Sequence, residues 1–158
     1  MNGAHLHLLI NHIPGIGLVV GVLILVYGTV RRKPDVVDVG LWVFVVTALV
    51  SVAVYLTGEP AEEIVEHMAD VSHDMIEVHE EAAIFALIST SILGLLSIAG
   101  LATRRRGTPR WLAVLTIVVA FWAASVLVRV SYLGGQVHHP EARSSFTPVP
   151  EEVHGPMP

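Results

Sequence analysis

The chain has 158 residues, of which 53% are hydrophobic and 15% charged, and its formal net charge is -5. Because a soluble domain carries about 25% charged residues, this composition excludes an ordinary water-soluble fold and predicts an all-α integral membrane four-helix bundle. The absence of cysteine excludes disulfides, thiolate metal sites, iron–sulfur clusters and covalently attached haem. The basic residues are not interleaved with aromatic ones as nucleic-acid binding requires, so no nucleic-acid partner is expected.

The first apolar run predicts a membrane-spanning helix over residues 4–30. No basic segment precedes it and no A-x-A-like cleavage site follows it, so we expect it to be retained as a helix. Pro14 lacks a backbone donor and predicts a kink. Three glycines beyond the proline permit close approach by a neighbouring helix or a flat cofactor: Gly15, Gly17 and Gly21.

The second apolar run predicts a span over residues 36–57, ended by Gly58. The acidic segment that follows carries a proline in its first turn and predicts an extramembrane helix over about 60–73. From there onward apolar residues recur every three or four positions: Ile64, Met68, Val71, Met75, Val78, Ala82 and Phe85. This stripe predicts helix but leaves open whether residues 61–103 form one helix or two.

The third and fourth spans are predicted over about 74–103 and 109–133, and the glycine pair at 134–135 is expected to end the fourth. Residues 1–135 would then form the bundle. The proline-rich segment 136–158 is expected to be an extended tail on the outer side.

Basic residues gather in the two short links between spans, at 31–33 and at 104–106 with Arg110. Because Lys and Arg in short loops stay cytoplasmic, we expect both links inside, and both termini and residues 59–81 outside, in a bacterial inner membrane. All nine histidines then fall at the outer end of the bundle: His5, His7, His12, His67, His73, His79, His138, His139 and His154.

Two of these histidines are placed to bind a ligand within the bundle. His12 lies about 9 Å into the helix beyond Leu6, at ~1.5 Å per residue, and an ionisable group at that depth usually has a function or a partner. His79 flanks the buried side of the apolar stripe near the bilayer, whereas His73 points away from it. The alternative for His12 is a neutral imidazole hydrogen-bonded between helices.

His139 and Arg129 complete the candidate site. His139 begins the tail, and the flexibility of the glycine pair would let it meet the other two histidines over the mouth of the bundle. Arg129 lies about one turn inside the outer end of the fourth span. It would anchor a haem propionate or, alternatively, extend to the lipid headgroups or pair with Glu80 or Glu81.

Four motifs add a resemblance, and they extend over most of the chain: Asn11-His12-Ile13-Pro14, Thr57-Gly58-Glu59-Pro60-Ala61-Glu62-Glu63, His79-Glu80-Glu81-Ala82-Ala83, and Gly134-Gly135-Gln136 with His139 and Glu141. With them the protein resembles a family of uncharacterised bacterial four-span membrane proteins, and its layout is similar to a domain-of-unknown-function group. The resemblance implies that His12, His79 and His139 belong to the family pattern. It carries no function with it.

Three functions are open at this point. The first is a b-type haem protein, with two imidazoles from facing helices on the iron, which transfers electrons to outer-side redox subunits or quinol. The second is a mononuclear copper or zinc site of His12, His79 and His139. The third is a cofactor-free structural subunit of a larger respiratory or photosynthetic complex. No nucleophile with a neighbouring base and no phosphate loop is present, so hydrolytic catalysis is not expected.

Overall fold

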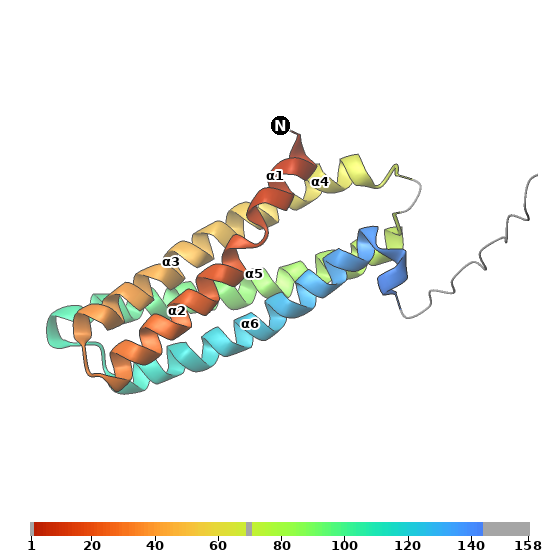
Figure 1. The fold of residues 1–158 in the computed structure, drawn as a ribbon. Helices are drawn as coiled ribbons and strands as arrows, with labels where there is room; N and C mark the ends of the chain where they lie inside the picture. Colours follow the sequence, from red (N-terminus) through yellow and green to blue (C-terminus); the bar gives the residue numbers. More distant parts are fainter. Residues whose placement is uncertain (1, 69–70, 144–158) are drawn as a thin grey trace, which may run out of the picture.

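The computed structural model describes residues 2–68 and 71–143, and this part of the chain contains helices and no β-strand. Figure 1 shows the long helices lying side by side in an elongated bundle. Four segments are long and apolar enough to cross a membrane: Gly3–Val30, Pro34–Val65, His73–Ala102 and Arg110–His138. The predicted all-α four-helix bundle is confirmed, and residues 144–158 of the predicted tail lie outside the described residues.

The first span is broken rather than kinked. Helix α1 covers Gly3–Ile10 and helix α2 covers Ile13–Val30, with Asn11 and His12 between them. Helix α1 begins where Asn2 accepts a hydrogen bond from the backbone of His5 at 2.9 Å. Helix α2 begins just before Pro14, because a proline is tolerated in the first turn, where its missing N–H would have no partner.

The segment after the second span, for which the sequence left open one helix or two, forms two separate helices. Helix α3 covers Pro34–Leu56 and helix α4 covers Gly58–Val65. The predicted extramembrane helix is therefore shorter than 60–73, and Gly58 begins a helix instead of ending one. Helix α5 covers His73–Ala102 and starts after the extended residue Ser72.

The last span also ends later than predicted. A short 3-10 helix, η1, covers Arg104–Arg106, and helix α6 then covers Arg110–His138. It is followed by a second 3-10 helix, η2, over Pro140–Ala142. Helix α6 passes through the glycine pair at 134–135, which was expected to end it. It ends instead at His138, because His139 precedes Pro140 and the residue before a proline disfavours the helical region.

The four long helices form a closed ring. Helix α3 lies against α2 and α5, and α6 lies against α5 and α2. Their facing side chains make the core: Leu18, Leu25, Val37, Leu41, Phe44, Leu93, Ala120 and Ala123. The outward faces are equally apolar, and each helix leaves a large side chain more than half exposed, for example Leu23, Leu49, Leu95 and Trp122. Apolar surface of this extent suits contact with lipid.

Six small polar residues that are buried between the helices have their hydroxyl groups paired. Each donates its hydroxyl to the backbone carbonyl four residues earlier in its own helix: Thr47, Ser51, Ser89, Thr90, Ser97 and Thr116. Small residues allow helix backbones to approach closely in a membrane, where hydrophobic burial does not drive association.

Glycines set the distance between α2 and α3. A side-chain carbon at Gly28 would lie 2.8 Å from the backbone nitrogen of Val37, so the two backbones nearly touch near their link. Further along α2, Gly17 faces Thr47 and Gly21 faces the ring of Phe44. The predicted role of Gly17 and Gly21 in close helix approach is confirmed, whereas Gly15 faces open space.

The two basic links lie at the same end of the bundle. In Figure 1 the turn from α2 to α3 and the connection from α5 to α6 lie together at one end, whereas α1, α4 and the end of α6 lie at the other. We call this second end the outer mouth. It is formed by α1, the junction of α3 and α4, the start of α5 and the end of α6.

Candidate functional site

Two histidines are turned into the outer mouth. Of the eight histidines that the structure describes, only His7 of α1 and His79 of α5 are half-buried. The other six are exposed: His5, His12, His67, His73, His138 and His139. The sequence prediction for His79 as an inward-facing residue and for His73 as a surface residue is therefore confirmed.

His7 is held by the junction of α3 and α4. Its Nδ1 atom lies 3.0 Å from the hydroxyl oxygen of Thr57. That hydroxyl donates its own hydrogen to the carbonyl of Val54 at 2.7 Å, so its oxygen accepts the hydrogen bond from Nδ1–H of His7. With the proton on Nδ1, the Nε2 atom carries a free lone pair.

His79 is held in the same way by α6. Its Nδ1 atom lies 3.1 Å from the backbone carbonyl of Val130, which can only accept, so Nδ1 is the donor. The imidazole lies on Gly134, where an added side-chain carbon would be 2.9 Å from Cε1 of the ring. The first glycine of the pair therefore makes room for His79 on the surface of a continuous helix.

The two imidazoles are held in the same chemical state: each donates Nδ1–H to an oxygen and leaves Nε2 as an acceptor. Asn11 lies one turn along from His7, on the same face, and its amide oxygen is buried without a hydrogen-bond partner in the described part of the chain. The outer mouth therefore offers acceptors, and a ligand that suits it is a metal centre or a hydrogen-bond donor.

The structure does not turn His12 and His139 inward. His12 is exposed at the start of α2, where its side chain makes no capping hydrogen bond. His139 is exposed beyond the end of α6, and its Nδ1 lies 2.9 Å from a carboxylate oxygen of Glu141. The backbone N–H of Glu141 itself, and then the His139 side chain, lower the pKa of that carboxyl.

Arg129 is exposed on the outward face of α6. Trp122, Ser125 and Tyr132 lie at helical spacings from it and are exposed as well. Within the described ranges Arg129 forms no ion pair, and Glu80, one of its expected partners, lies next to Glu62 instead. This placement suits extension of the guanidinium along the surface to the lipid headgroups.

Residues 2–68 and 71–143 contain no group of three or more His, Asp or Glu side chains that could hold a metal ion. Three of the residues that build the mouth were not predicted to be part of the site: His7, Thr57 and Val130. The fold is that of a multi-pass α-helical membrane protein with four candidate spans, and it carries a half-buried imidazole on α1 and another on α5. No family model, no curated protein and no solved structure matches the chain.

Proposed function

We propose that this chain is a membrane-embedded electron-transfer protein that binds one b-type haem at its outer mouth. His7 and His79 are the axial ligands in this proposal. The observation that carries it is the matched state of the two imidazoles: both donate Nδ1–H to an oxygen and keep Nε2 free. Histidines that bind metals almost always have their other ring nitrogen held in this way, which fixes the tautomer and the ring orientation.

The number of ligands favours haem over a zinc or copper ion. A structural zinc site takes four protein ligands and a catalytic one takes three, whereas the described part of the chain offers no such group. A haem supplies four nitrogens of its own and requires only two axial ligands from the protein. Two imidazoles from different helices meet that requirement.

The position of the mouth suits electron exchange outside the membrane core. His7 and His79 lie near the ends of helices whose apolar parts continue toward the basic links. A cofactor there would be close to the aqueous side, within reach of an outer-face redox subunit or of a quinol in the bilayer. Arg129, on the outward face, has no part in this proposal.

The test is an optical spectrum of the protein purified in mild detergent, followed by titration with haem if the protein is isolated without it. We expect a Soret band from a six-coordinate haem. His7→Ala and His79→Ala should each weaken haem retention at least tenfold, the range seen when the support of a metal ligand is lost. His12→Ala and His139→Ala are matched controls, because both residues are exposed, and these variants should retain the spectrum.

Three results would count against the proposal. A folded protein that takes up no haem would favour the third function, a cofactor-free structural subunit. Equal loss of haem in His12→Ala and His79→Ala would restore the site predicted from the sequence. Stoichiometric copper or zinc without a Soret band would indicate the mononuclear site.

A further inference from the structure

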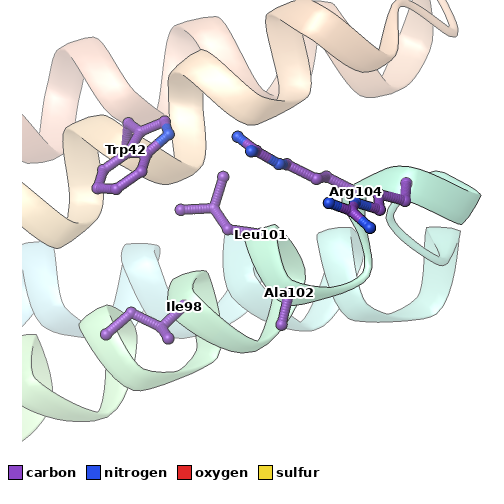
Figure 2. A pocket seen from close by; sticks show the side chains of 6 residues that line it. Trp42, Ile98, Leu101, Ala102 and Arg104 are labelled. Atoms are coloured by element: carbon purple, nitrogen blue, oxygen red, sulfur yellow. The ribbon is translucent and has the colours of Figure 1, made fainter.

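A pocket lies at the end of the bundle opposite the outer mouth, on the surface between α3 and α5. Its volume is about 400 Å³, within the range of roughly 300–1,000 Å³ typical of small-molecule sites. It is lined by Trp42, Ile98, Leu101, Ala102, Arg104 and Arg105. Figure 2 shows Trp42 on α3 and Leu101 on α5 at the opening, with Arg104 where the chain leaves α5.

A close contact between the two helices involves the chain neighbours of two lining residues, Trp42 and Leu101. A side-chain carbon at Gly100 would lie 2.8 Å from Leu41, so the glycine allows α3 and α5 to meet there. Trp42 follows Leu41 in the chain and is turned away from the core, with 53% of its surface exposed. Ile98 is 52% exposed. The wall of the pocket is therefore apolar and opens toward the surrounding bilayer.

The arginines are held at the rim by the end of α5. The hydroxyls of Thr103 and Thr108 both donate to the carbonyl of Gly100, at 2.7 and 3.2 Å. Gly107 adopts a φ of 80°, which only glycine adopts without strain, and completes the turn. These contacts fix the chain before and after η1, so the first two arginines of η1 lie beside the apolar wall.

The charge at this rim is not balanced by the protein. Arg104 and Arg105 are exposed, and neither forms an ion pair in the described part of the chain. The only acids in the sequence near the basic end are Asp35 and Asp38, against seven basic residues. A basic pocket between transmembrane helices attracts the negatively charged headgroups of lipids.

We propose that this pocket binds an anionic phospholipid from the leaflet at the basic end of the bundle. Its phosphate lies between Arg104 and Arg105, and the upper part of one acyl chain lies along Trp42, Ile98 and Leu101. A soluble anion would use the arginines but not the apolar wall, whereas a phospholipid uses both. The proposal is independent of the haem site at the outer mouth.

Tryptophan fluorescence in lipid nanodiscs tests this proposal directly. In a Trp111→Phe/Trp122→Phe background, Trp42 is the remaining tryptophan, and brominated lipids quench a tryptophan that they touch. We expect brominated phosphatidylglycerol to quench Trp42 in preference to brominated phosphatidylcholine. Arg104→Gln/Arg105→Gln should reduce this preference by roughly fivefold for each arginine removed.

Two further variants separate a built pocket from general attraction to charge. Arg31→Gln/Arg32→Gln removes the same charge from the other basic link and should keep the preference. Ala102→Phe keeps both arginines but places a large side chain in the space for the acyl chain. It should abolish the preference while leaving the charge of the basic link unchanged.

Equal quenching by the two lipids would overturn the proposal, as would the same loss in the Arg31/Arg32 variant. Competition by millimolar inorganic phosphate would also overturn it, because it would show a site for the free anion. If Ala102→Phe kept the preference, the acyl chain would not lie in the pocket, and the proposal would be wrong.

Discussion

The imidazole of His79 occupies the space that a side chain at position 134 would fill. Its neighbour Gly135, in contrast, faces open space. The two adjacent glycines therefore differ in whether an added side chain would meet His79, which makes them a matched pair for mutation.

We expect Gly134→Ala to displace the His79 ring and weaken its hydrogen bond to Val130. Replacing glycine by alanine inside a helix is favourable by about 0.5–1 kcal/mol, and Gly135→Ala should show that gain. Gly134→Ala should be about 1–3 kcal/mol less stable than Gly135→Ala, the usual cost of overpacking. Reversible unfolding of the two variants in detergent micelles would measure the difference, and equal stabilities would contradict the assigned contact.

The sequence identifies His79 but not His7, and the reason is the break in the first span. A wheel drawn through one continuous helix places His5 and His12, seven residues apart, on the same face and turns His7 elsewhere. The break at Asn11 separates His12 from that wheel. The partner of His7, Thr57, lies fifty residues away, so no local pattern reveals the pair.

At the scale of helices, the local sequence predicts the presence of a helix more accurately than the residues at which it begins and ends. The spans can be predicted from their apolar composition, because a long apolar segment in lipid must pair its own backbone polar groups and therefore forms a helix. The ends depend on tertiary contacts. Gly134 has a poor helix propensity, yet α6 continues through it, and the missing side chain leaves room for the imidazole of His79.

The α2–α3 pair should be sensitive to added volume at Gly28. Gly28→Ala would place a carbon 2.8 Å from the backbone nitrogen of Val37. A backbone atom cannot rotate aside as a side chain can, so the helices must separate. We expect a loss of about 1–3 kcal/mol, measured as a shift in the midpoint of unfolding by SDS.

Gly15→Ala is the control for this change, because no atom lies within 4 Å of the added carbon. It should leave the stability unchanged or raise it by up to about 1 kcal/mol. If Gly28→Ala proved as stable as Gly15→Ala, the two backbones would not be in contact at that point.

At the scale of the whole molecule, the orientation in the membrane is a prediction from charge. The natural chain lacks cysteine, so single-cysteine variants can be read without background. Glu63→Cys should react with an impermeant thiol reagent in intact cells, and Arg106→Cys should react only after the membrane is opened. Both residues are exposed, so burial would not explain a difference. The opposite pattern of labelling would reverse the topology.

The two basic links also bear on how the chain is synthesised. The first two spans and the last two spans each form an antiparallel hairpin, and each hairpin is closed by its own basic turn. Because Lys and Arg in short loops favour the cytoplasmic side, we expect each hairpin to carry its own orientation signal, and the signals of the two turns agree.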